Sequence, residues 1–294
     1  MPEGEPRLDL RDMTEADLED GLRLSRASGW NQTIEDWRLL LSLGPGLFRV
    51  AVEEGHIVAS GGAVRYGDAL AWICMILVDP VRRGHGIGTR IFDDVLDRTE
   101  ALVRTGGLRV VGLDATPAGR GIYVQRGFQE SGGIVRMRAE GERKGSGLES
   151  CPPTVRPLAS EDLAAVLALD RGVFGADRGA VLRRAFAEAP SLAWVAHQAE
   201  RTGYCFGRHG DHSDHVGPVA ADDPALARDL VSACLSRPRS RPLIVDARTE
   251  LSWLAVLAGM GFREQRPFTR MYRGKSRPAA RPALEPAVFG PEFG

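Results

Sequence analysis

The stretch that decides the fold is Val78-Asp79-Pro80-Val81-Arg82-Arg83-Gly84-His85-Gly86-Ile87-Gly88-Thr89. An apolar run over residues 71–78 leads into it and predicts a buried strand. Beyond the glycines, apolar residues recur at helical spacing while acidic residues fall on the opposite side, which predicts an amphipathic helix. The apolar positions are Ile87, Ile91, Val95 and Leu102.

The glycine-rich turn predicts an anion-binding site. The first amides of a helix lack intrahelical partners and lie at the positive end of its dipole. Gly84, Gly86 and Gly88 carry no Cβ atom to keep a phosphate away, and Arg83 adds a fixed positive charge. The alternative is an ordinary turn before a helix, but strand, arginine, glycines and helix together favour a phosphate ligand.

The spacing narrows the choice of phosphate ligand. A dinucleotide fingerprint needs a third glycine where Thr89 stands, and a triphosphate loop needs a lysine that is missing. The run Arg83-x-x-Gly86-x-Gly88 instead resembles the pyrophosphate loop of the GNAT acyltransferase superfamily. This resemblance implies acetyl-CoA as co-substrate, with no metal. It implies that the cofactor is held by Leu77, Val78, Arg83, Gly84, His85, Gly86, Ile87, Gly88, Thr89 and Thr116, with a backbone N–H near Leu77 and Val78 stabilising the oxyanion.

Composition sets broad limits on partners and location. The 294 residues are 43% hydrophobic and 26% charged, with a formal net charge of −1, so nothing suggests a nucleic-acid partner. No apolar run is long enough to span a bilayer, and the acidic start over residues 1–5 is unlike a secretion signal. The four cysteines are widely separated, which favours free thiols. We therefore expect a cytoplasmic protein without membrane partners.

The chain reads as two copies of one plan. Residues 10–18 are echoed by residues 155–163, and each stretch predicts a short strand followed by a capped helix start. Near the end of each half, a Gly-Phe pair leads to an Arg-Met pair at the same spacing, at residues 127–137 and again at residues 261–271. We predict a first domain over residues 1–142, a linker over 143–153, a second domain over 154–275 and a flexible tail over 276–294.

Each half is expected to form an α/β fold with a mixed sheet. In the first half, strands over residues 48–52, 57–64 and 71–78 form a meander, with a hairpin turned at Glu54-Gly55. A buried strand over residues 108–113 and a helix over 117–126 follow the loop helix. This mixed order agrees with the tandem GNAT-like domains that the resemblance implies.

The first half carries the residues expected to do chemistry. Residues 114–128 resemble the late helix of the superfamily and its Gly-Phe ending. The resemblance places Tyr123 where a tyrosine protonates the departing thiolate, and a phenol with a pKa of about 10 suits that step. The alternative is a core tyrosine at a helix-to-strand junction. Thr116 stands where the superfamily often has an asparagine that bonds the pantetheine arm.

The second half lacks both the basic glycine loop and the tyrosine, and it is predicted to be a degenerate GNAT-like domain. Asp222 and Asp223 stand where the basic glycine loop would be, and their carboxylates would repel a pyrophosphate. Leu257 occupies the position of Tyr123 counted back from the Gly-Phe pair.

Candidate acceptor-binding residues lie in two places. The resemblance puts the segment with Trp30, Asn31 and Gln32 over the acceptor pocket, although a plain loop before a capped helix is an equal alternative. His215 could face a pocket at the domain boundary. The histidines over residues 209–215 alternate faces if the segment is extended, so a polar turn explains them better than a metal site does.

These observations predict an N-acetyltransferase of a two-domain bacterial GNAT subfamily. It would move an acetyl group to a primary amine of a small molecule, by direct attack, a tetrahedral intermediate and thiolate protonation. Because no general base stands out, a non-catalytic acyl-CoA-binding or regulatory module stays open as the alternative. The intact loop argues against a purely structural scaffold. Either a monomer or a homodimer is compatible with the duplication.

Overall fold

The computed structural model describes residues 8–141, 152–237, 240–274 and 280–294. Most of the predicted linker, residues 143–151, lies outside the described residues. The chain divides into two compact units. The first comprises Met1–Leu113, Arg273–Ser276 and Phe293, and the second comprises Asp114–Tyr272, Arg277–Glu292 and Gly294.

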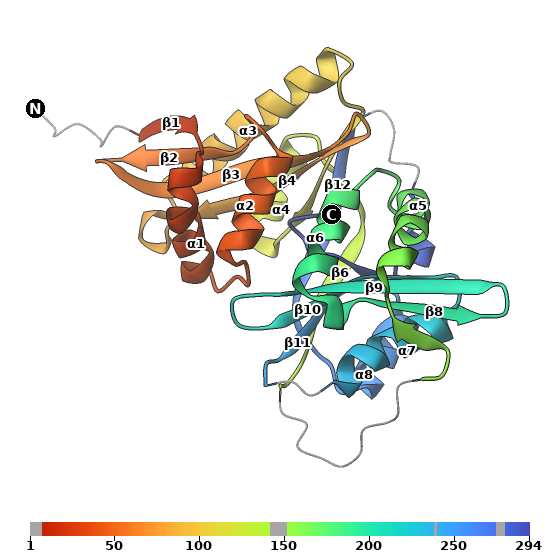
Figure 1. Cartoon of the computed structure of the whole chain (residues 1–294). Helices are drawn as coiled ribbons and strands as arrows, with labels where there is room; N and C mark the ends of the chain where they lie inside the picture. Colours follow the sequence, from red (N-terminus) through yellow and green to blue (C-terminus); the bar gives the residue numbers. More distant parts are fainter. Residues whose placement is uncertain (1–7, 142–151, 238–239, 275–279) are drawn as a thin grey trace, which may run out of the picture. The chain divides into compact units, whose positions relative to one another are not determined.

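The first unit holds a mixed sheet in the order β1-β2-β3-β4-β5 (Figure 1). Neighbouring strands are antiparallel except β4 and β5, which run parallel. In chain order the elements are β1 (Leu8–Asp12), η1 (Glu15–Asp17), α1 (Leu18–Ala27), α2 (Ile34–Leu43), β2 (Arg49–Glu53), β3 (His56–Tyr66), β4 (Leu70–Val78), η2 (Pro80–Arg82), α3 (Ile87–Arg104) and β5 (Val110–Ala115).

Helix α3 is held by the apolar stripe that the sequence predicted. It packs on β2, β3 and β4, where its Ile87 and Ile91 join Ala51 and Ala59 in one buried cluster. Helices α1 and α2 pass in front of the strands in Figure 1. The predicted hairpin joins β2 and β3, with φ of 50° at Glu54 and 82° at Gly55, the pair of left-handed residues typical of a tight turn.

The second unit has a sheet in the order β12-β6-β11-β13-β10-β9-β8-β7, in which β10 and β11 are parallel. Strands β8 and β9 have α5 and α6 on one side and α7 on the other in Figure 1. In chain order the elements are α4 (Pro117–Gln125), β6 (Gln129–Ala139), β7 (Val155–Pro157), η3 (Ser160–Asp162), α5 (Leu163–Phe174), α6 (Gly179–Glu188), η4 (Pro190–Leu192), β8 (Trp194–Gln198), β9 (Arg201–His209), β10 (Asp214–Ala221), α7 (Pro224–Ser236), β11 (Leu243–Arg248), α8 (Leu251–Gly259), β12 (Arg263–Gly274), η5 (Pro282–Leu284) and β13 (Ala287–Val288).

The last strand of the first sequence half lies in the sheet of the second unit. Strand β6 belongs to the first half of the sequence, yet it lies between β11 and β12 of the second half. Its Arg136 pairs with Asp246 on β11 at 2.7 Å, and the corresponding Arg270 on β12 pairs with Asp114 on β5 at 2.7 Å. The compact units therefore do not coincide with the predicted domains, residues 1–142 and 154–275. Those two ranges describe the duplication in the sequence, and their boundary stays a prediction.

The prediction of a loose tail is wrong for residues 280–294. This segment contributes η5 and β13, and β13 pairs with both β10 and β11. Phe289 is only 2% exposed, and the carboxylates of Glu285 and Glu292 are buried against arginines. A composition rich in proline, alanine and glycine misled the prediction, because a few large side chains anchor the segment.

Candidate active site

The candidate cofactor loop begins at the end of β4 with a rigid turn. Asp79 accepts a hydrogen bond from the Val81 N–H at 3.2 Å, and so starts the short helix η2. Its other carboxylate oxygen accepts from Arg23 at 2.8 Å, while its own N–H donates to the Val58 carbonyl. The chain therefore leaves the sheet on a fixed path before the glycines begin.

The glycines give the loop its shape. Gly84 and Gly86 have φ of 84° and 75°, the left-handed region that other residues adopt only at a cost. Gly86 is the N-cap of α3, and its carbonyl accepts the first bond of the helix from the Arg90 N–H. A Cβ atom at either position would meet nothing within 4 Å, so the loop surface is open. The first turn of α3 contains no acidic residue, which leaves its positive end uncompensated.

Arg83 fixes the loop through two hydrogen bonds and also gives it a positive charge. Its Nε donates to the Val78 carbonyl at 3.1 Å, and its Nη2 donates to the Ser28 hydroxyl, also at 3.1 Å. His85 is exposed, with its Nδ1 3.4 Å from the Arg82 carbonyl. Ile87 is buried under the loop and anchors it to the sheet.

Strands β4 and β5 separate just where the cofactor is expected. Their parallel register covers only three pairs, from Leu70 with Val110 to Trp72 with Gly112. The ladder between β3 and β4 is interrupted nearby, and Met75 has φ of 57°. The outer part of β4, with Leu77 and Val78, is thus not paired with β5 in the described register. Nothing in the sequence signalled this bulge, because Met75 is not a residue that favours a left-handed backbone.

Tyr123 lies on α4, as predicted, and is described within the second unit. Its ring is partly buried and packs against Phe128, with ring centroids 6.3 Å apart. Burial raises the pKa of the Tyr123 phenol to about 12. The phenol therefore stays protonated at neutral pH and can act as a proton donor.

Thr116 and Gly119 build the start of α4. The Thr116 hydroxyl accepts from the Gly119 N–H at 3.3 Å, so its main described contact is a helix cap. A Cβ atom on Gly119 would lie 3.0 Å from the Tyr123 hydroxyl oxygen. The glycine therefore leaves room for the phenol to fold back over the first turn of its own helix.

The predicted acceptor segment is largely buried. Asn31 and Gln32 are 1% and 2% exposed, and Trp30 is partly buried. Just after them Thr33 forms a capping box with Asp36 at the start of α2. Of the predicted acceptor residues in this segment, Trp30 offers the most accessible surface, and their contact with an acceptor stays a prediction.

The helix start in the second unit is built differently. Asp223 caps α7 by accepting from the Ala225 N–H at 2.7 Å, and it pairs with Arg201. Asp222 accepts from the Thr202 N–H at 3.1 Å. Leu257, at the position that corresponds to Tyr123, is completely buried. These carboxylates occupy the helix end that an anion would need.

His215 is completely buried. Its Nε2 lies 3.2 Å from Oδ2 of Asp246, outside good hydrogen-bond geometry, and Asp246 itself is held by Arg136. Phe289 packs against the imidazole ring. Burial lowers the pKa of His215, Asp246 opposes this, and the charges of Arg208 and Arg136 add to the lowering. The contacts of His215 in this structure are with Asp246 and Phe289, and its contact with an acceptor stays a prediction.

This burial predicts a pH-dependent stability. Unfolding frees His215 to take up a proton below its unfolded pKa of about 6.5, so the unfolded state binds more protons and stability falls as pH drops. We expect His215→Asn to remove about 1 kcal/mol of the loss in unfolding free energy between pH 7.5 and 5.5, as measured by urea unfolding. His56→Asn, at an exposed hairpin position, is the control and should keep the wild-type pH dependence. Identical pH dependence in all three proteins would contradict the assignment.

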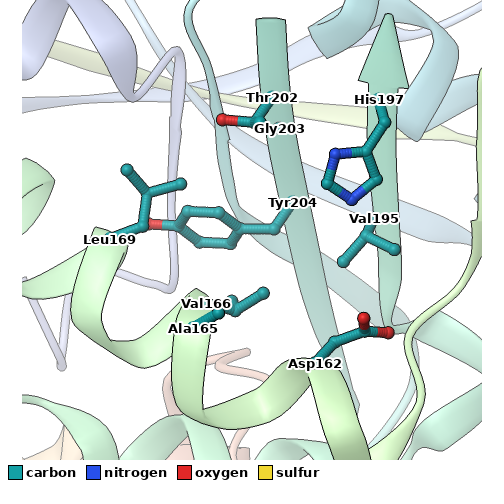
Figure 2. Close-up of a pocket in the computed structure, with 9 residues that line it drawn as sticks. All are labelled: Asp162, Ala165, Val166, Leu169, Val195, His197, Thr202, Gly203 and Tyr204. Carbon is teal, nitrogen blue, oxygen red and sulfur yellow. The ribbon is translucent and has the colours of Figure 1, made fainter. Parts of the chain in front are cut away.

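A small pocket of about 130 Å³ lies in the second unit and was not predicted. Figure 2 shows that Val166 and Leu169 come from α5, while Val195 and Tyr204 project from β8 and β9. Asp162 stands at one side, and its hydrogen bonds from Arg156 lower its pKa to about 2. The same arginine–aspartate pairing joins Arg11 to Asp17 in the first unit, at the equivalent positions of the sequence echo. The walls are mostly apolar.

Neither a metal-binding group nor a membrane-spanning helix is found in the described ranges. No group of three or more His, Cys, Asp or Glu side chains in them is arranged to hold a metal ion. None of the helices in the described part of the chain is long and apolar enough to cross a membrane.

Comparison with protein families identifies the class of this protein. Residues 44–130 match the model of an acetyltransferase (GNAT) domain, and residues 166–284 match a second model with the same description. Together the two matches cover more than half of the chain. The chain therefore belongs to the GNAT acetyltransferase family, with two GNAT domains in tandem, and it is an acyltransferase. The resemblance drawn from the loop and the predicted α/β fold are confirmed.

Individual relatives agree with this assignment. A protein named holothin acyltransferase from Pseudoalteromonas sp. is 25% identical, and the alignment covers 85% of this chain and 82% of the relative. A putative acetyltransferase from Pyrococcus horikoshii has the same fold, with a TM-score of 0.76 and 20% identity over 98% of this chain and 96% of that one. A tandem GNAT protein from the clavulanic acid biosynthesis pathway matches with a TM-score of 0.60 and 14% identity, over 92% of this chain and 100% of that one.

Proposed function

We propose that this acyltransferase moves the acetyl group of acetyl-CoA to a primary amine of a small molecule, with a single site in the first half of the chain. The observation that carries the proposal is the loop before α3. It combines left-handed glycines at 84 and 86, a helix start without acidic residues, and the braced charge of Arg83. Such a loop can bind a pyrophosphate through backbone amides. The acyl-CoA dependence of the family supports acetyl-CoA as the ligand.

In the proposed reaction the protein positions the amine and the thioester, stabilises the oxyanion and donates one proton to the departing thiolate. The amine nitrogen attacks the thioester carbonyl carbon, and a C–N bond forms while the oxygen becomes an oxyanion, which a backbone N–H near Leu77 or Val78 stabilises. When this tetrahedral intermediate collapses, the C–S bond breaks and the thiolate takes the phenolic proton of Tyr123. The proton lost by the amine passes to water, and the Tyr123 phenolate regains a proton from water, so the enzyme returns to its starting state. The raised pKa of Tyr123 keeps the phenol protonated before the thiolate departs.

A small-molecule acceptor is supported by the relatives. The relative from Pseudoalteromonas sp. is named as an acyltransferase of holothin, and the tandem GNAT protein of similar fold comes from the clavulanic acid biosynthesis pathway. The partly buried Trp30 could provide an aromatic wall of the acceptor site, with neutral side chains beside it.

The test is an assay of free thiol release from acetyl-CoA across a panel of primary amines. Acetyl-CoA should also raise the melting temperature, because a ligand at 100 times its Kd stabilises the folded state by about 2.7 kcal/mol. Arg83→Ala should reduce this shift, whereas Asp223→Ala, at the corresponding helix start of the second unit, should leave it unchanged. Equal reduction by both changes would contradict a single site in the first half. A stabilised protein that releases no thiol with any amine would favour the non-catalytic alternative.

Tyr123→Phe is expected to lower kcat about 100-fold, because a positioned general acid contributes about that much or more. The KM for acetyl-CoA should change little, since the phenol acts only as the sulfur departs. Steady-state kinetics with the best amine of the panel measures both. Tyr66→Phe is the control, because it removes a phenol that donates to the Phe293 carbonyl at 2.6 Å and should affect stability alone. Unchanged kcat would remove Tyr123 from the mechanism.

A further inference from the structure

The second unit has a strand opening like that of the first, but it is filled. Strands β10 and β11 are parallel over only two pairs, Asp214 with Leu243 and His215 with Ile244. Beyond them β10 has a bulge between Val216 and Val219, just as β4 is irregular where it leaves β5. In the second unit the gap is closed by β13, which comes from the end of the chain.

Backbone pairing seats β13 between the two strands. Ala287 lies opposite Val219 on β10 and Ala247 on β11, and Val288 lies opposite Asp246. The segment is antiparallel to both neighbours. Addition of an extended peptide to exposed strand edges is a common mode of peptide recognition, in which main-chain hydrogen bonds give the affinity.

A glycine makes this close approach possible. A Cβ atom on Gly217 would lie 2.1 Å from the Val288 carbonyl oxygen, which no side chain could tolerate. The side of β10 that faces the opening is thus shaped for a backbone. On the other flank of the segment, Val288 joins Ile134 and Phe268 in a buried cluster.

Buried arginines receive the two carboxylates of the segment. Glu285 accepts from Arg178 at 2.7 Å and from Arg248 at 2.5 Å, and Glu292 pairs with Arg208. Arg208 keeps 4% of its side chain exposed, and Glu292 keeps 3%. Charge-assisted bonds of this kind are strong and directional, so they set both the register and the polarity of the peptide.

We propose that the opening between β10 and β11 is a binding site for an extended acidic peptide, and that residues 285–292 of the chain are its built-in ligand. The second domain thus takes a peptide strand where a GNAT domain would take a thioester. The ligand is recognised by its backbone, by a small residue and a valine at its centre, and by carboxylates seven positions apart. This inference does not depend on the acceptor or on the chemistry of the first half.

The test uses the full chain with its own segment disabled. Glu292→Lys places an ammonium beside Arg208, and it should release the segment so that the amides of Ala287 and Val288 exchange with deuterium at least about tenfold faster. A labelled synthetic peptide with the sequence of residues 285–292 should then bind this variant with one peptide per chain. The wild type should bind it at least about tenfold more weakly, because its own segment competes. A peptide with glutamine at both glutamate positions should lose most of the binding.

A control and a second variant keep the test decisive. Glu200→Lys makes the same charge change in an exposed turn and should behave as the wild type. Should Glu292→Lys not fold, Gly290→Ala serves instead, because Gly290 has φ of 140° and an added Cβ would lie 2.8 Å from Oε2 of Glu292. Protected amides in the folded variant, or released amides without peptide binding, would overturn the proposal. So would a second equivalent of acetyl-CoA bound by the variant, since the opening would then be a thioester site. Loss of acetyl-CoA binding altogether would instead bear on the first half and the proposed function.

Discussion

Gly86→Val is expected to weaken acetyl-CoA binding about 10- to 100-fold, the equivalent of about 1.4–2.8 kcal/mol. The residue caps α3 with φ of 75°, where a side chain costs about 1–2 kcal/mol and a β-branched one more. The chain can relieve this strain by turning the loop, which moves the amides that would hold the pyrophosphate. Calorimetric titration with acetyl-CoA measures the affinity.

A matched control lies at the other end of the same helix. Gly106 has φ of 74°, is exposed, and has nothing within 4 Å of an added Cβ. Gly106→Val should therefore cost similar folding stability in a thermal melt without ligand, while the affinity for acetyl-CoA stays at the wild-type value. Equal affinities in the two variants would contradict the placement of the cofactor on this loop.

The second large effect is expected from Arg178→Met, which should destabilise the protein by about 3–5 kcal/mol. The guanidinium is completely buried, donates to Asp170 at 2.8 Å and to Glu285 at 2.7 Å, and stacks 4.1 Å from the centre of the Phe174 ring. The Tyr204 hydroxyl completes the cluster by donating to Asp170. Methionine restores much of the volume but leaves two buried carboxylates without this cation. Urea unfolding at pH 7 measures the loss.

The pH dependence of this deficit separates charge from packing. Burial alone would raise the pKa of Glu285, but Arg178, Arg248 and Arg270 outweigh it, so the wild-type pKa is lowered. Stability from this group is therefore present at neutral pH and is lost as pH falls. Without Arg178 less of that contribution remains to be lost, so the deficit of the variant should shrink as pH falls below the unfolded glutamate pKa of about 4.3, for example between pH 5 and pH 3. A deficit that is constant with pH would point to packing instead.

Arg156→Met is the matched control for that variant. Its partner Asp162 is held at 2.6 Å, but the arginine side chain is 51% exposed. Exposed pairs contribute at most about 1 kcal/mol, so the melting temperature should change little. If Arg156→Met destabilised the protein as much as Arg178→Met, burial of the ion pair would not explain the loss of stability.

The loop and its helix were predictable because their causes are local. Left-handed backbone at the turn demands glycine, and the apolar spacing of α3 dictates the face that it buries. The same holds for α4, predicted over residues 117–126 and found over Pro117–Gln125, where proline follows a threonine cap. Tyr123 was placed by its distance from the Gly-Phe pair, which is also a local relation.

The bulge in β4 and the filled opening of the second unit could not be predicted in this way. Met75 has no residue preference that signals a left-handed backbone. Gly217-Pro218 inside a strand was a usable signal for a bulge, since proline cannot donate to a ladder. Nothing in its neighbourhood indicated that Val288 would lie against it, because the two positions are far apart in the chain.

The sequence by itself determined the class of fold, the tandem plan and the glycine loop before α3. The loop depends on residues within one or two turns of chain, and the tandem plan is visible because local patterns recur in the same order. Tertiary structure alone decided that β6 joins the second unit, that His215 is buried, and that β13 forms near the end of the sequence. These outcomes depend on buried pairs between distant residues, such as Arg136 with Asp246 and Arg178 with Glu285. Removing water from such a charge costs free energy unless its partner is buried beside it, and local sequence carries no record of which distant partner that will be.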